Sequence, residues 1–432
     1  MAQTNNKFLD KMTAFFEKWL GPVAEFMNTN IYVNSIRDAF TIQMPIIIIG
    51  SFALLLNIFI CGQNGLAGIE SLSWLSNYSS MFSTINYACI SCMALWTVIL
   101  LAYSLAKRKG LKAEFAAILA AVCFLILTNQ ENVSGNLGAS ALFLSFFVGI
   151  TSVALFSKLM TMDAIKIKLN ESVPPMIANS FNSLIPAAIV LLIFGIGAGV
   201  LYGSTGLYLN DLIYKFIQVP FNQIVGSQLG VSIIIVLSQL LWWMGIHGHM
   251  AMNVVAKPVR QAAIAANMEA VAAGLLPTQW YTLAYVHTFT NLGGGGIVIS
   301  LAIALLLFSK RQDAKKITKV SMIPLICGIS EPMVFGLPIM LNPVYIIPFV
   351  LTPLVCGNIG YYALTSGFLT PSYVESIAGM PLFIQQLLAY SGQWQAIFLM
   401  VVVILVGIVI YTPFVLLDNK QLKKESENHN DL

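Results

Sequence analysis

The sequence predicts an all-α integral membrane protein with about ten transmembrane helices, re-entrant hairpins and amphipathic surface helices. Of its 432 residues, 58% are hydrophobic and only 9% are charged. A soluble domain carries roughly a quarter charged residues, so a surface this apolar is typical of a protein in lipid. The apolar residues form runs of about 20, and they lack the alternating pattern of a membrane β-barrel. The spans are therefore expected to be helices.

Five spans are expected in the first half of the chain, residues 1–223. Residues 8–27 carry apolar positions at helical spacing and predict a helix lying on the membrane surface. The expected spans are 40–60, 82–106, 115–128, 142–156 and 176–200. Basic clusters at 107–112 and 158–168 alternate with loops that lack Lys and Arg. By the positive-inside rule, the N-terminus and both clusters lie in the cytoplasm.

The second half, residues 224–432, has a less regular pattern. Its expected elements are a span at 228–250, an Ala-rich surface or re-entrant helix at 261–275, two short spans divided by the glycines at 293–296 within 280–308, a hairpin at 327–338, a span at 344–364, an outside segment at 365–393, and a span at 394–414. Glycine-interrupted apolar segments are typical of transporter binding sites. We therefore expect a five-helix scaffold and dimerisation half, followed by a substrate-binding transport half. The polar tail after residue 418 is expected in the cytoplasm.

Glu331 is the first candidate functional residue. It lies in the apolar stretch 327–338, where Gly328, Pro332 and Gly336 oppose a regular helix. A carboxylate at membrane depth is costly and usually functional, and irregular backbone there is tolerated only where it is buried in protein or lines a cavity. The alternatives are an ion pair with a lysine of residues 310–319, or a role in capping the turn.

His247 is the second candidate, at the end of an apolar helix behind Trp242 and Trp243. Its glycine neighbours leave room for a ligand, and indole faces pack well on the C–H patches of sugar rings. The alternative is an interfacial aromatic belt with His247 facing headgroups. Residues two apart on a helix point in different directions, so His249 is expected to be structural.

Three amides complete the candidate substrate-binding residues. Asn291 directly precedes the glycine run, and its side chain can both donate to and accept from a hydroxyl. It can also simply end a helix. Asn136 and Gln239 are further candidates of the same kind, with structural roles as the alternative. One carboxylate, one imidazole, one amide and two indoles fit a neutral polyol better than an ion path, which would need a chain of acids.

Several other functions are not indicated by the residues. Lys and Arg occur in short clusters without interleaved aromatic residues, so nucleic-acid binding is not expected. Cys89 and Cys92 have the spacing of a redox or metal pair, but no second pair or His cluster accompanies them. We therefore interpret these thiols as helix-packing residues and expect no metal and no cofactor. No cleaved signal peptide is expected from the polar N-terminus.

The chain resembles enzyme IIC of the bacterial phosphotransferase system, in the lactose/cellobiose/diacetylchitobiose branch. The stretches that carry the resemblance are Trp242–Gly248, Gly328–Pro332 with Phe335-Gly336, Glu171–Pro175, Arg37-Asp38 and Met44-Pro45. The resemblance implies a homodimer with the first five helices at its interface and the sugar bound by the second half. Ser330 stands where the family often has threonine, and Asn170 where a proline often precedes the 171–175 stretch.

Site residues and partners follow from the same resemblance. His247 and Glu331 are expected to meet the sugar hydroxyl that is phosphorylated, and Trp242 and Asn291 are similar to sugar contacts. The phosphoryl donor is expected to be a phosphocysteine on a separate soluble IIB protein, served by IIA, on the cytoplasmic side of the bacterial cell membrane. The function implied is import of a β-linked disaccharide such as cellobiose.

Two other functions remain open from the sequence. An ion-coupled sugar symporter would also use an intramembrane acid and a histidine. An enzyme acting on lipid-linked sugar is more distant, because it would need an acidic metal-binding cluster that the sequence does not contain. Pocket shape decides specificity, so the sequence does not distinguish cellobiose from lactose, diacetylchitobiose or glucose.

Overall fold

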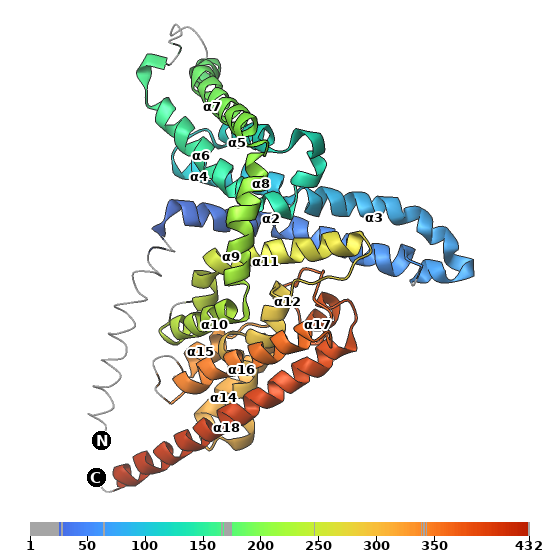
Figure 1. The fold of residues 1–432 in the computed structure, drawn as a ribbon. Helices are drawn as coiled ribbons and strands as arrows, with labels where there is room; N and C mark the ends of the chain where they lie inside the picture. Colours follow the sequence, from blue (N-terminus) through green and yellow to red (C-terminus); the bar gives the residue numbers. More distant parts are fainter. Residues whose placement is uncertain are drawn as a thin grey trace. The chain divides into compact units, whose positions relative to one another are not determined.

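The computed structural model describes residues 26, 29–63, 65–165, 167, 175–245, 247–337, 339, 342 and 344–430. Within these residues the regular structure is entirely helical, so the predicted all-α fold class is confirmed (Figure 1). The chain divides into two compact units, one within Asn28–Gln223 and one that contains Ile224–Leu432. The predicted surface helix at 8–27, apart from Phe26, and the stretch 171–174 lie outside the described residues.

Six helices in the described ranges are long and apolar enough to cross a membrane, or up to eight if each of two bent pairs counts as one span. The shorter apolar helix α5 (Ala113–Leu127) falls outside this number. The protein is therefore a multi-pass membrane protein, but the predicted number of ten spans is not established. The glycine-interrupted stretch, expected as two spans, forms one broken run over Leu283–Phe308.

The first unit is a helical bundle. Its α-helices are α2 (Ile31–Leu56), α3 (Ser79–Asn86), α4 (Met93–Arg108), α5 (Ala113–Leu127), α6 (Leu142–Met160), α7 (Pro175–Thr205), α8 (Leu209–Ile213) and α9 (Val219–Val225), the last of which crosses the boundary of the unit after Gln223. Small residues let α4, α5 and α6 pack closely: Ala102 and Ala120 are fully buried, and a Cβ added at Gly149 would come within 2.8 Å of Leu101. Asp38 joins α2 to α4, because its Oδ2 accepts from Ser104 Oγ and Arg108 Nη2, both at 2.6 Å.

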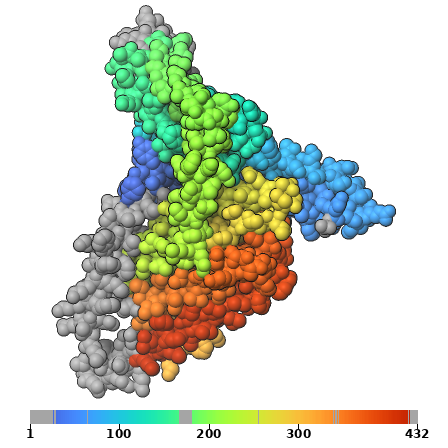
Figure 2. Space-filling view, in the orientation of Figure 1, coloured from blue at the N-terminus to red at the C-terminus, as the bar shows by residue number. Residues whose placement is uncertain are grey.

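The second unit contains the interrupted helices. Its α-helices are α10 (Gln228–Trp243), α11 (Gly248–Ala272), α12 (Leu283–Tyr285), α13 (Val298–Phe308), α14 (Gln312–Ile326), α15 (Glu331–Gly336), α16 (Ile346–Thr365), α17 (Ile384–Ala389) and α18 (Trp394–Asn430). Helix α18 packs against α13 and α16. In the space-filling view, the orange and red segments of this unit form a continuous surface (Figure 2).

Two boundaries in this unit differ from the prediction. The span expected to reach Met250 ends at Trp243, because Gly245 adopts φ 86° and breaks the helix. Helix α11 then runs without interruption through Lys257 and Arg260, whereas we expected a separate helix at 261–275. Both cationic side chains are buried within the unit, at 8% and 7% exposure, so these charges do not mark a helix end.

The segment 365–393 was expected on the outside; after Thr365, which ends α16, its residues pack against other helices of the same unit. Asn267 of α11 donates to Ser372 O at 2.8 Å, and Leu382 N donates to Ile326 O at the end of α14, also at 2.8 Å. Glu375 is 2% exposed and accepts from Gln261 Nε2 at 3.3 Å. This burial raises the pKa of Glu375 to about 7, because removal from water disfavours the carboxylate.

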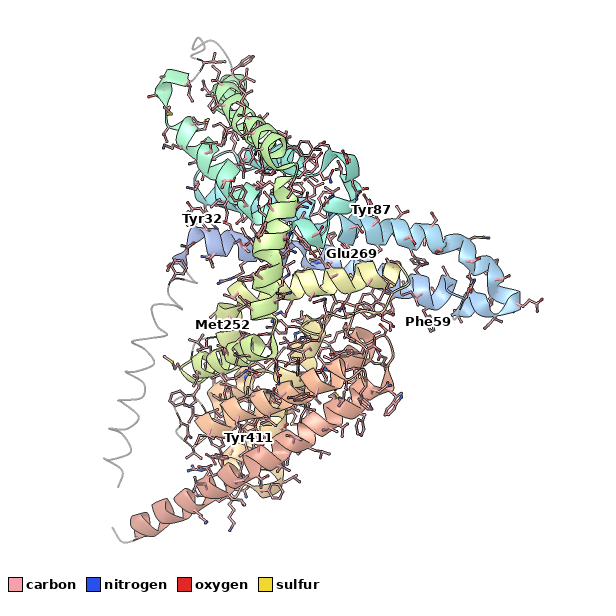
Figure 3. All side chains as sticks on the ribbon, in the orientation of Figure 1. Tyr32, Phe59, Tyr87, Met252, Glu269 and Tyr411 are labelled. Atoms are coloured by element: carbon pink, nitrogen blue, oxygen red, sulfur yellow. The ribbon has the colours of Figure 1, made fainter. Side chains whose placement is uncertain are left out.

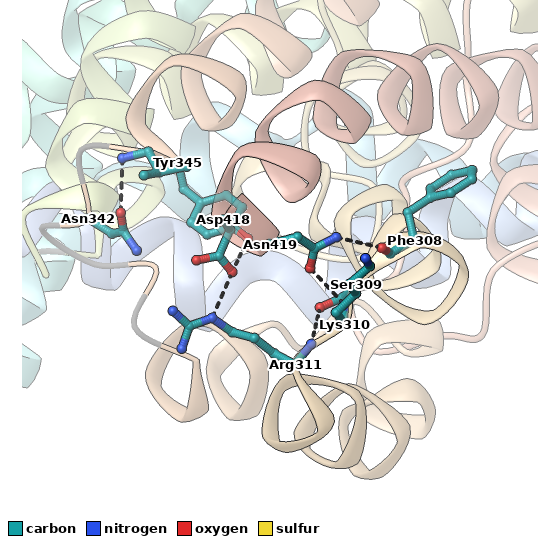
Figure 4. A network of polar contacts seen from close by, with 9 residues as sticks. Phe308, Ser309, Lys310, Arg311, Asn342, Tyr345, Asp418 and Asn419 are labelled. Atoms are coloured by element: carbon teal, nitrogen blue, oxygen red, sulfur yellow. Dashed lines mark hydrogen bonds and ion pairs between the residues drawn. The ribbon is translucent and has the colours of Figure 1, made fainter. Parts of the chain in front are cut away.

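A polar network ties the start of α14 to α18 (Figure 4). Arg311 Nε lies 3.2 Å from Asp418 Oδ2, which also accepts from Tyr345 OH at 3.4 Å. Asn419 Oδ1 accepts from Lys310 N at 2.7 Å, and its Nδ2 donates to Phe308 O at 2.8 Å. The backbone between α13 and α14 is thereby satisfied by the side chain of α18. The network anchors the base of the α14–α15 hairpin.

Candidate functional site

The break between α10 and α11 presents His247. It caps the N-terminus of α11, where its Nδ1 accepts from Met250 N at 3.3 Å. A neutral imidazole that accepts through Nδ1 carries its proton on Nε2. A side chain at position 248 would overlap the Ser238 carbonyl, so Gly248 allows α11 to start directly against α10. The ring therefore has a fixed position and offers an N–H donor.

The break between α14 and α15 presents Glu331. After α14, Gly328 adopts φ 76° and donates to Leu325 O at 2.9 Å, while Ile329 donates to Pro324 O at 2.9 Å. These bonds satisfy carbonyls left open at the end of the helix. Helix α15 then begins at Glu331, followed by Pro332, which is well suited to a first helical turn. The predicted interruption at this motif is therefore present.

The two breaks bring His247 and Glu331 together. Nε2 of His247 lies 3.9 Å from Oε1 of Glu331, and the side chains are 43% and 45% exposed. This separation is too long for a direct hydrogen bond, so both groups remain available to a ligand. His247 lies outside the spanning helices, and partial burial lowers its pKa, an effect that nearby Glu331 opposes. The neutral ring thus offers a donor beside a carboxyl group that can accept.

A glycine turn lies between the two motifs and continues from Asn291. A β-carbon added to Gly294 would overlap Ser330, and one added to Gly295 would lie 3.1 Å from the indole of Trp242. The turn therefore touches the residue next to Glu331 on one side and the helix before His247 on the other. Ile297, a β-branched residue, adopts φ 55° at the end of the turn. Such strained backbone persists where the surrounding structure fixes it, often at functional sites.

Asn291 has an unsatisfied acceptor in this turn. Its backbone N–H donates to Val286 O at 2.8 Å, but its buried Oδ1 has no hydrogen-bond partner among the described residues. Buried polar atoms are nearly always paired, so an orphaned acceptor calls for a donor such as a ligand hydroxyl. Asn291 therefore has an acceptor available for a ligand hydroxyl at the start of the glycine turn.

Trp242 supports His247 from behind. The two ring centroids lie 4.4 Å apart at an interplanar angle of 44°, and Trp242 is only 3% exposed. Its indole N–H donates to His249 Nδ1 at 3.1 Å, which gives His249 a structural contact. A direct sugar contact by Trp242 stays a prediction.

The remaining two amides lie in different units. Gln239 is fully buried, and its Oε1 accepts from Gly296 N at 2.9 Å, so it contacts the glycine turn. Asn136 belongs to the first unit, where it donates to Asn132 O and accepts from Asn210 Nδ2, each at 2.8 Å. Sugar contacts by both residues stay predictions.

Tyr411 was missed by the sequence reasoning. Its hydroxyl donates to Gly296 O at 2.7 Å from the middle of α18. A single tyrosine in a long apolar run gives no signal of this kind, because such residues are common in spanning helices. Ser330, which packs against Gly294, was also not predicted as a site residue. The sequence did contain a signal for it, because Ser330 directly precedes Glu331 within the same motif.

Broken apolar helices that converge on a polar site define a class of protein, a multi-pass membrane transporter. The family model described as "Phosphotransferase system, EIIC" matches residues 37–353. The chain belongs to the EIIC family of the phosphotransferase system. This finding confirms the resemblance drawn from the motifs and does not support the symporter alternative.

Relatives match nearly the whole chain. The chain is 29% identical to the oligo-beta-mannoside-specific EIIC component of Bacillus subtilis (strain 168), over 95% of this chain and 96% of that protein. It is 26% identical to the cellobiose-specific EIIC component of Lactococcus lactis subsp. lactis (strain IL1403), over 95% and 99%. The crystal structure of ChbC, the IIC component of an N,N'-diacetylchitobiose-specific phosphotransferase system, superposes with a TM-score of 0.86 at 26% identity, over 96% of this chain and 99% of that one.

Proposed function

We propose that this EIIC protein imports a β-linked disaccharide and holds one of its hydroxyl groups between His247 and Glu331 for phosphorylation. The observation that carries the proposal is the 3.9 Å approach of these two side chains from separate helix breaks. The substrate class is supported by the named specificities of the relatives, which are oligo-β-mannosides, cellobiose and diacetylchitobiose. Asn291 and Trp242 are the proposed further sugar contacts.

The pair has complementary hydrogen-bonding chemistry for a hydroxyl. The oxygen accepts from His247 Nε2–H, and the hydroxyl proton points to Glu331. Phosphoryl transfer depends mainly on a positioned nucleophile, and a nearby base removes its proton as the new bond forms. The sulfur–phosphorus bond of a phosphocysteine breaks, the oxygen–phosphorus bond to the sugar forms, and Glu331 receives the proton. The donor cysteine leaves as a thiolate.

The proposed donor is a separate IIB protein, which receives its phosphoryl group through IIA. Both proteins are soluble and reach the site from the cytoplasm. The membrane is the bacterial cytoplasmic membrane, with both chain termini on its inner side, as the alternation of basic loops favours. Residues 1–223 are proposed to form the dimer interface of a homodimer, and residues 224–432 to carry the sugar.

Uptake should depend on the phosphoryl donor. Cells that express this chain with its IIB and IIA proteins are expected to accumulate radiolabelled cellobiose as a phosphate ester. Cells that lack the soluble proteins should not concentrate the sugar, because nothing traps it inside. Chromatography of the extracted label distinguishes the two forms. Sustained, gradient-driven accumulation of unmodified sugar without IIB would contradict the proposal and favour a symporter.

Specificity should follow the linkage of the disaccharide. Purified protein is expected to bind at least one of cellobiose, lactose and diacetylchitobiose about 10-fold or more tightly than maltose, whose α-linkage places the second ring in a different direction. Isothermal titration calorimetry with this panel measures the difference. Tighter binding of maltose than of all three β-linked sugars would overturn the substrate class.

A further inference from the structure

Gly296 is held at both of its backbone polar atoms by side chains from two other helices. Its N–H donates to Gln239 Oε1 of α10 at 2.9 Å, and its carbonyl accepts from Tyr411 OH of α18 at 2.7 Å. Both side chains are fully buried. Tyr411 lies on α18 in Figure 3, more than 100 residues along the chain from the turn that it contacts.

This arrangement replaces the hydrogen bonds of a regular helix. Gly296 adopts φ 74°, and the residue after it is also left-handed, so the chain cannot continue the α-helical ladder here. A buried backbone N–H or carbonyl without a partner is costly, and the two side chains supply both partners. The ring of Phe349 on α16 occupies the place that a β-carbon would need. Three helices therefore fix the conformation of one residue.

The fixed turn is the part of the chain that touches both functional motifs. Gly294 packs against Ser330, which directly precedes Glu331, and Gly295 packs against Trp242, which lies against His247. A shift of the turn would therefore change the packing of Ser330 beside Glu331 and of Trp242 beside His247. Asn291, with its unpaired Oδ1, precedes the same turn and would shift with it.

We propose that Tyr411 and Gln239 are positioning residues for the sugar site, acting through their hydrogen bonds to the carbonyl and the N–H of Gly296. The inference rests on the proposed function for the identity of the ligand. It assigns Tyr411 no contact with the sugar. Loss of its hydroxyl should weaken sugar binding because the turn no longer holds Asn291 and the two motifs in one arrangement.

The test compares Tyr411→Phe with the matched variant Tyr285→Phe. Tyr285 is also buried, and its hydroxyl donates to a backbone carbonyl, Gly357 O, at 2.9 Å, but this acceptor belongs to helix α16 and not to the glycine turn. Both variants remove one buried hydroxyl–carbonyl hydrogen bond, so both should lower thermal stability by a similar amount. Tyr411→Phe should in addition weaken cellobiose binding about 10-fold and raise the KM for sugar in transfer from phosphorylated IIB. Tyr285→Phe should leave binding within about twofold of wild type.

Calorimetric binding is measured on the monodisperse fraction of each purified protein, with cellobiose as the ligand. A second variant, Gln239→Met, removes the partner of the Gly296 N–H and should reproduce the loss of affinity, which guards against a failure of Tyr411→Phe to fold. Equal affinities for Tyr411→Phe and Tyr285→Phe would overturn the inference. Wild-type protein that binds cellobiose but supports no phosphoryl transfer from phosphorylated IIB to the sugar would overturn the proposed function, while a binding loss confined to Tyr411→Phe and Gln239→Met would still support the positioning role.

Discussion

Glu331→Gln should lower the rate of sugar phosphorylation by about 10²- to 10⁴-fold while sugar binding stays within about 10-fold of wild type. Glutamine has nearly the same shape as glutamate and can still hydrogen-bond a hydroxyl, but it cannot take the hydroxyl proton. The rate of phosphoryl transfer should therefore fall more than the affinity for the sugar. The measurement is transfer of labelled phosphate from phosphorylated IIB to cellobiose, beside calorimetric binding of the same sugar.

A suitable control is Glu269→Gln on α11. Glu269 belongs to the same unit but is exposed and lies 22 residues along the chain from His247. Its substitution should leave transfer within about twofold of wild type. Wild-type transfer by Glu331→Gln would remove the proposed base role. A loss of binding as large as the loss of transfer would instead assign Glu331 to recognition alone.

Gly294→Ala should abolish detectable sugar binding. The added methyl group would overlap Ser330, and the residue adopts φ 105°, a conformation that alanine rarely takes. The turn would have to move away from the α14–α15 tip, which separates Asn291 and Trp242 from Glu331. Binding of cellobiose to purified protein is the readout, with thermal unfolding to measure the cost to the fold.

Gly367→Ala is the matched control for this substitution. Gly367 also has positive φ, at 79°, but no atom lies within 4 Å of an added β-carbon. Its alanine variant should be destabilised by about 1–3 kcal/mol through backbone strain, yet bind sugar as wild type does. If the two variants bind sugar equally well, the close contact between the glycine turn and Ser330 has no functional importance.

The interruptions of the fold could be predicted from the sequence with some success. Gly328 before Glu331, and the glycine run after Asn291, oppose helix formation for local reasons, and the structure breaks at these places. Pro332 and Gly336 were expected to oppose a helix as well, but both lie within the short helix α15, because proline fits a first helical turn. The apolar runs likewise indicated spanning helices. Local chemistry is sufficient for such features, because backbone freedom depends on the residue at the position itself.

Other features depend on distant contacts and had no local signal. The sequence predicted a span at 228–250 and a separate helix at 261–275, but one continuous helix, α11, runs through Gly248–Ala272, and tertiary packing buries Lys257 and Arg260 within it. Tyr411 gained its importance only when α18 packed beside the glycine turn. The sequence also did not predict that residues 366–393 pack against other helices. Polar side chains in this segment, such as Glu375, find their partners on helices that are distant in the chain.

A structure of the protein with bound cellobiose tests the central claim most directly. The account predicts that one sugar hydroxyl oxygen lies within hydrogen-bond distance of both His247 Nε2 and Glu331 Oε1. It also predicts that a second hydroxyl donates to Asn291 Oδ1. A sugar bound with every hydroxyl away from the His247–Glu331 pair would contradict the account.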